Sequence, residues 1–113
     1  MFARKDQRRL CQRVGCDPQY VDGPETVAAS AGVFGPDWPV IAIRHRAIGD
    51  MCGWYLWTGE FSAEPGFFRP VQAEEVWAAR PELTGYLALP AGHGFVVAPG
   101  YEDVWQDPTL RNV

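Results

Sequence analysis

The chain has 113 residues, a formal net charge of −4 and 47% hydrophobic residues, which is the composition of a small globular protein and excludes a disordered or fibrous one. No apolar run approaches the roughly 20 residues that a membrane-spanning helix needs. The basic N-terminal stretch has no apolar segment behind it that would make a secretory signal. We therefore expect a cytoplasmic protein without membrane contact.

The first half of the chain predicts one helix and three strands. Ala3–Val14 is expected to form a basic helix that Gly15 ends, because its apolar residues recur four positions apart. Prolines and glycines mark the loop that follows. Strands are then expected at Thr26–Phe34, Val40–Arg46 and Gly53–Thr58.

The third of these strands alternates in a way that assigns its faces. Trp54 and Leu56 lie on one face, and Tyr55 and Trp57 lie on the other. Because both faces carry aromatic side chains, we expect this strand to be central and covered on both sides.

The second half predicts two helices followed by two strands. Helices are expected at Gln72–Arg80 and Pro81–Leu89, then a strand at Phe95–Ala98. Pro99-Gly100 fits the centre of a type II turn, which leads into a last strand at Tyr101–Trp105. Along that strand, one face should carry Tyr101, Asp103 and Trp105, and the other Glu102 and Val104.

This order of elements predicts an α+β fold, with an antiparallel sheet of four to five strands and helices packed on one side. We expect a single domain over residues 1–113, in which the N-terminal helix (1–15) precedes an α+β body (26–113).

The cysteines indicate neither disulfides nor a metal. Three cysteines cannot all pair within one chain, so the disulfide framework of a small secreted domain is not expected. Cys11 and Cys16 do not form a CxxC pair, and His45 and His93 lie far from them in sequence. We predict free, mostly buried thiols, no metal and no cofactor.

No set of residues in the sequence makes a convincing catalytic site. Cys52 could pair with His93, but neither an orienting third group nor an oxyanion site is recognisable. Glu60 and Glu64 flank a turn without an apolar pocket, and no phosphate-binding glycine motif follows a strand. We predict a protein that is not an enzyme and has no catalytic residues, with Cys52/His93 chemistry as the alternative to test.

Charge is unevenly distributed along the chain. The first 20 residues hold five basic and two acidic residues, whereas eight acidic residues and three arginines follow Gly59. An acidic body repels phosphate backbones, so nucleic-acid binding is not expected and a basic protein surface is the favoured partner.

Two segments combine aromatic and acidic residues. Cys52–Glu60 and Pro99–Asp107 hold three of the five tryptophans, interleaved with carboxylates. Such aromatic density suits either a small core or the anchor of a protein–protein interface. The interleaved acids favour the interface.

Several motifs between residues 40 and 113 together resemble a family of bacterial immunity proteins. They are Ile43-Arg44-His45, Gly53 to Glu60 (GWYLWTGE), Pro65 to Pro70 (PGFFRP), Tyr86 to Gly92 (YLALPAG) and Pro99 to Trp105 (PGYEDVW). The combination is similar to the thirty-third immunity family of polymorphic-toxin systems, which overlaps a domain of unknown function. His93-Gly94 departs from the pattern, because an aromatic residue is expected directly after the Pro-Ala-Gly turn.

The resemblance implies a small α+β protein that is encoded beside a toxin, binds it and neutralises it. We expect occlusion of the active site or substrate groove of a toxin that acts in the cytoplasm and has a basic surface. The candidate toxin-binding residues are Tyr101, Glu102, Asp103, Trp105 and Asp107, with Glu60 and Trp57 as second choices.

Three alternatives stay open. Trp57 and Trp105 could belong to the core rather than to an interface. The aromatic residues could line a small-molecule pocket in a ligand-binding or regulatory domain that has no toxin partner. An exposed last strand could also pair with that of a second copy and form a homodimer.

Overall fold

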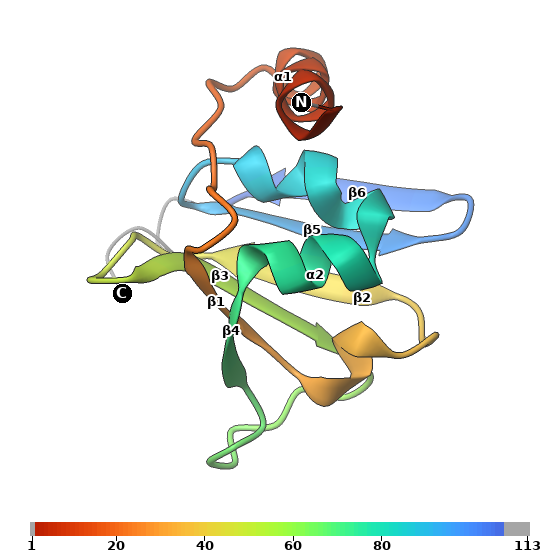
Figure 1. Ribbon diagram of the computed structural model, residues 1–113. Helices are drawn as coiled ribbons and strands as arrows, with labels where there is room; N and C mark the ends of the chain where they lie inside the picture. The colour runs from red at the N-terminus through yellow and green to blue at the C-terminus, as the bar shows by residue number, and fades with distance from the viewer. Residues whose placement is uncertain (1, 108–113) are drawn as a thin grey trace.

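The computed structural model describes residues 2–107 and has the predicted α+β fold (Figure 1). Its elements in chain order are α1 (Phe2–Val14), β1 (Thr26–Ala29), the 3-10 helix η1 (Ala31–Phe34), β2 (Val40–Arg44), β3 (Met51–Thr58), β4 (Arg69–Gln72), α2 (Ala73–Ala79), the 3-10 helix η2 (Pro81–Ala88), β5 (His93–Ala98) and β6 (Tyr101–Gln106).

The six strands form one mixed sheet in the order β4-β1-β3-β2-β5-β6. All neighbours are antiparallel except β1 and β3, which are parallel. The expectation of a purely antiparallel sheet of four to five strands was therefore wrong in detail. β1 and β2 run in opposite directions, and β3 lies between them. Because β3 forms an antiparallel hairpin with β2, it runs parallel to β1. The added strand β4 pairs with β1 at the edge of the sheet, where no strand was predicted.

Two predicted elements differ in type. The expected strand at residues 26–34 ends at Ala29, and the chain then turns into η1, where the N–H of Val33 donates to the carbonyl of Ser30. The helix predicted at Pro81–Leu89 is the 3-10 helix η2. Its first hydrogen bond, from the N–H of Leu83 to the carbonyl of Arg80, spans three residues. The helices expected at the N-terminus and after residue 72 are confirmed as α1 and α2.

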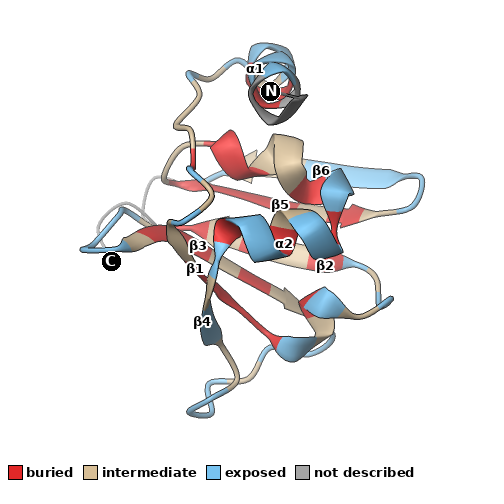
Figure 2. Cartoon of the chain, in the orientation of Figure 1, coloured by how far each residue is buried: buried red, intermediate tan, exposed pale blue. Residues whose placement is uncertain are grey.

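Helices pack on one face of the sheet only, as predicted. Figure 2 shows the buried segments in red where α2 and η2 face the strands. The core between these layers includes Leu10 and Cys11 of α1, Ala73 and Val76 of α2, Leu83 and Leu87 of η2, and the strand residues Val27, Val40, Trp54, Leu56 and Phe95.

The predicted alternation of side chains along β3 is confirmed, but the predicted covering of both faces of this strand is not. Trp54 and Leu56 are fully buried against the helices, whereas Tyr55 and Trp57 on the other face are half-buried. The expected central position of β3 is confirmed. Its second face has no helix over it among residues 2–107, and Tyr55 and Trp57 there contact the rings of the following connection.

A buried arginine ties the helix layer to the sheet. Arg44, on the covered face of β2, donates from Nε to the carbonyl of Cys52 (3.0 Å). Its Nη1 lies within hydrogen-bond distance of the carbonyls of Gln19 (2.8 Å), Leu87 (3.2 Å) and Leu89 (2.9 Å). Three segments distant in sequence are thus held by one side chain.

Candidate functional site

The face of the sheet that lies away from the helices is here called the open face. Residues directly opposite one another on neighbouring strands point to the same side, so the register identifies its members. From β6 across to β1 they are Tyr101, Asp103, Trp105, Ala98, Val96, Gly94, Ile41, Ile43, Trp57, Tyr55 and Ala28. All but Asp103 are apolar or aromatic or are glycine, so this is an apolar surface, and none of the helices that the structure describes covers it.

One end of the open face carries a cluster of aromatic rings, here called the aromatic cluster. It consists of Tyr55 and Trp57 of β3 and of Phe61, Phe67 and Phe68 from the β3–β4 connection. Phe68 contacts both strand residues, with ring centroids 5.3 Å from Tyr55 and 6.0 Å from Trp57. The rings meet mostly edge to face, the geometry that aromatic pairs prefer.

At the other end of the open face, Trp105 lies directly over Gly94. A Cβ atom added to Gly94 would lie 2.5 Å from Cζ2 of the Trp105 indole, so only glycine leaves room for the ring there. The indole is half-buried on this surface, in contrast to Trp54, which lies in the helix-covered core. Gly94 thus leaves the space that the Trp105 indole occupies.

The structure brings four of the seven candidate residues onto one face. Tyr101, which is 57% exposed, Asp103, Trp105 and Trp57 all lie on the open face. Glu60 is exposed and is the second residue of the connection after β3.

Two other candidates lie elsewhere. Asp107 follows the end of β6, where its N–H donates to the carbonyl of Gly92 (2.6 Å). Glu102 points to the helix side of β6, because it stands opposite the buried Val97.

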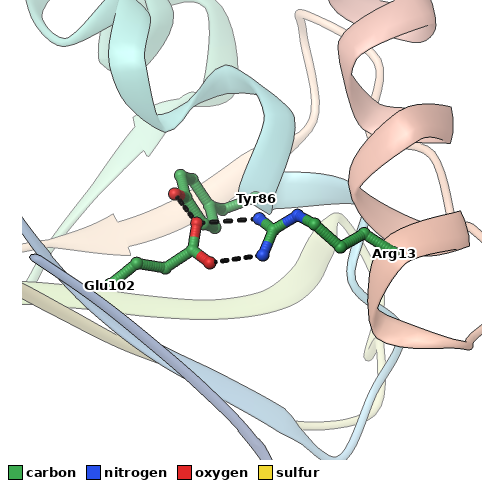
Figure 3. A network of polar contacts seen from close by, with 3 residues as sticks. All are labelled: Arg13, Tyr86 and Glu102. Atoms are coloured by element: carbon green, nitrogen blue, oxygen red, sulfur yellow. Dashed lines mark hydrogen bonds and ion pairs between the residues drawn. The ribbon is translucent and has the colours of Figure 1, made fainter.

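The Glu102 carboxylate is engaged within the chain (Figure 3). It receives two parallel hydrogen bonds from the guanidinium of Arg13, Nη1 to Oε1 at 2.6 Å and Nη2 to Oε2 at 2.8 Å. The hydroxyl of Tyr86 also donates to Oε2. Arg13 holds the pKa of Glu102 below its usual range, while burial and the nearby carboxylate raise the pKa of Tyr86 to about 12.

The phenylalanines of the aromatic cluster were missed as site residues. Phe67 and Phe68 were noticed only as part of a family motif, and Phe61 not at all. A signal existed in the run GEFSAEPGFF, which places three phenylalanines in a turn-rich connection where no strand or helix periodicity would bury them.

The groups considered for catalysis are enclosed. Cys52 is 1% exposed and burial raises the pKa of its thiol, so it is protonated at neutral pH. His93 is also buried, with Nδ1 3.1 Å from the carbonyl oxygen of Pro90. Among residues 2–107, no group of three or more His, Cys, Asp and Glu side chains could hold a metal ion. No helix within the same range is long and apolar enough to cross a membrane.

A hollow of about 800 Å³ lies between the end of α1 and the last two strands. Its lining is mixed: Asp17, Gln19, His93 and Gln106 face it beside apolar residues such as Val14, Val104 and Trp105. The aromatic cluster does not line this hollow. Its Tyr55 borders a second hollow of about 490 Å³, together with His45, Arg46, Ile48, Met51 and Gly53.

The Imm33-like domain model matches residues 6–107. The chain belongs to the Imm33-like family of immunity proteins. The Imm33-like match confirms the resemblance recognised in residues 40–113 and extends it to α1, so the basic helix and the sheet belong to one family domain. No solved structure matches the chain significantly.

Proposed function

We propose that this Imm33-like protein binds a cognate toxin in the cytoplasm through its open face and neutralises it by occluding the active site or substrate groove. The observation that carries the proposal is an apolar sheet face that no helix within residues 2–107 covers, in a member of an immunity family. Monomeric proteins rarely expose a contiguous apolar surface of this kind unless a partner covers it.

The residues on the open face suit tight capture. Tyr101 and Trp105 on β6 and Trp57 on β3 offer large, stiff side chains, the types that dominate interface hot spots. Asp103 stands between Tyr101 and Trp105 and adds a carboxylate to this apolar surface. The acidic body of the chain would steer a toxin with a basic surface and so raise the association rate.

We propose a smaller role in toxin binding for the other three candidates, Glu60, Glu102 and Asp107. Glu60 lies beside the aromatic cluster and can reach the same partner. Glu102 is held by Arg13 on the other side of β6, and Asp107 lies past its end. We propose that these last two contribute less to binding than Asp103 does.

The first experiment is co-expression of this protein with the product of the adjacent gene. The proposal expects a one-to-one complex and survival of the cells. A well-folded protein that gives neither complex nor rescue would contradict it, and would favour the ligand-binding alternative and a metabolite screen.

Variants then locate the interface. Asp103→Lys and Trp105→Ala should weaken capture while the protein stays folded. Glu82→Lys is the matched control, because it makes the same charge change at an exposed position of η2, on the helix side. Equal protection by all three variants would exclude the β6 side of the open face as the contact.

A further inference from the structure

The β3–β4 connection, residues 59–68, projects beyond the first residue of β4, at the opposite end of the view from α1 (Figure 1). Local bonds shape it: the N–H of Glu64 donates to Oγ of Ser62 (3.1 Å), and the N–H of Phe67 donates to the carbonyl of Glu64 (3.1 Å). Gly66, with φ +87°, takes a left-handed conformation between them. The segment is therefore an ordered projection.

Phe61 is displayed on this projection rather than buried by it. Its side chain is 59% exposed, yet its ring lies 5.4 Å from that of Trp57, 5.9 Å from Phe68 and 6.1 Å from Phe67. The supporting rings are themselves fixed to β3 through the contacts of Phe68. An exposed ring that is already held in place loses little conformational entropy when a partner covers it.

The charges of this projection have one sign. Residues 59–68 contain Glu60 and Glu64, both exposed, and no basic residue. Arg69 begins β4 but stands opposite the buried Ala29, so it belongs to the helix-covered side. Within residues 2–107, no ion pair neutralises either glutamate.

The geometry points to this projection as the anchor of the toxin interface: Phe61 enters an apolar pocket, and Glu60 and Glu64 pair with basic side chains that line a groove on the toxin. The inference rests on the function proposed above and names the chemistry of the partner. A symmetric contact between the projections of two copies does not fit, because it would bring four glutamates together and residues 59–68 contain no basic residue. A convex acidic projection with an apolar tip fits a concave basic surface, such as a substrate groove.

The test uses the purified full chain and the catalytically inactivated product of the adjacent gene, with association and dissociation rates measured at low and high salt. Phe61→Ala is expected to raise the Kd at least about 30-fold, mostly through faster dissociation. Phe34→Ala is the matched control, because this phenylalanine is 42% exposed on η1, outside the aromatic cluster, and its loss should change the Kd less than threefold. The double change Glu60→Gln with Glu64→Gln should slow association and flatten its salt dependence.

Hydrogen exchange on the unmodified complex keeps the test independent of folding defects in the variants. Amides of residues 59–68 should gain protection when the toxin binds. A complex that forms without this protection, or that Phe61→Ala leaves equally tight, would overturn the anchor while leaving the immunity function intact. Failure of the unmodified protein to bind the adjacent gene product would instead overturn the proposed function, and the anchor with it.

Discussion

Arg13 and Glu102, 89 residues apart in sequence, form a two-point ion pair that joins the last turn of α1 to β6. Tyr86 of η2 donates to the same carboxylate, so three elements meet at one group (Figure 3). The basic helix is thereby attached to the sheet, and its charge is partly matched inside the molecule. This limits how far the basic N-terminus and the acidic body can be treated as separate surfaces.

The contribution of this pair to stability should be small and dependent on pH. The side chains of Arg13 and Glu102 are 57% and 30% exposed, so Glu102→Gln should lower the free energy of unfolding by no more than about 1 kcal/mol. Because Arg13 lowers the pKa of Glu102 in the folded state, the contribution is complete above the ordinary value of 4.5 and is lost as the pH falls below it. Urea denaturation of Glu102→Gln and of the unchanged protein between pH 3 and pH 7 measures this. An equal difference in stability at both ends of that range would contradict it.

Replacing Arg44 should lower the free energy of unfolding far more than Glu102→Gln does. Arg44→Met would leave the carbonyls of Cys52, Gln19 and Leu89 without this donor in a buried site, and each orphaned acceptor costs about 1–3 kcal/mol. We expect a loss of about 3 kcal/mol or more in the free energy of unfolding. Arg46→Met, at an exposed position two residues further on, should change it by less than about 0.5 kcal/mol. Similar values for the two variants would contradict the role assigned to Arg44.

Two glycines with positive φ give a matched pair for backbone strain. Gly53 has φ +103°, and a Cβ atom there would lie 2.0 Å from the carbonyl oxygen of His45. Gly49 has φ +59° with nothing within 4 Å of the added atom. Gly49→Ala should therefore cost about 1 kcal/mol and Gly53→Ala about 3 kcal/mol or more, since the second adds a clash to the conformational penalty. Thermal denaturation checks the order, and a larger effect at Gly49 would contradict it.

The three thiols should react at very different rates in the folded protein. Burial raises the pKa of Cys11 to about 12, helped by a hydrogen bond with Cys16, and burial also raises the pKa of Cys52. Both thiols are protonated at pH 7.5 and shielded from solvent, whereas Cys16 is partly exposed. A chromogenic disulfide reagent should modify about one thiol per chain quickly and the other two only after unfolding. The variant Cys16→Ser should abolish the fast phase; three equally fast thiols would refute this assignment.

The sequence alone was sufficient wherever the signal is local. The helix ended by Gly15, the opposite faces of Trp54 and Trp57 along β3 and the alternation of Tyr101 to Trp105 all follow from spacing within one element. The family was also within reach, since its motifs are short runs of specific residues. Each of these features depends on neighbours a few positions away along the chain.

Only the tertiary structure decided which strands are neighbours and which faces stay open. Three contacts join residues that are distant in sequence. β3 inserts between β1 and β2, Arg13 pairs with Glu102, and the Trp105 indole packs on Gly94. The exposure of Phe61 on its aromatic support is of the same kind. The spacing of residues along the chain does not predict these contacts. They depend on which strands pair and on the packing of the described helices against one face of the sheet only.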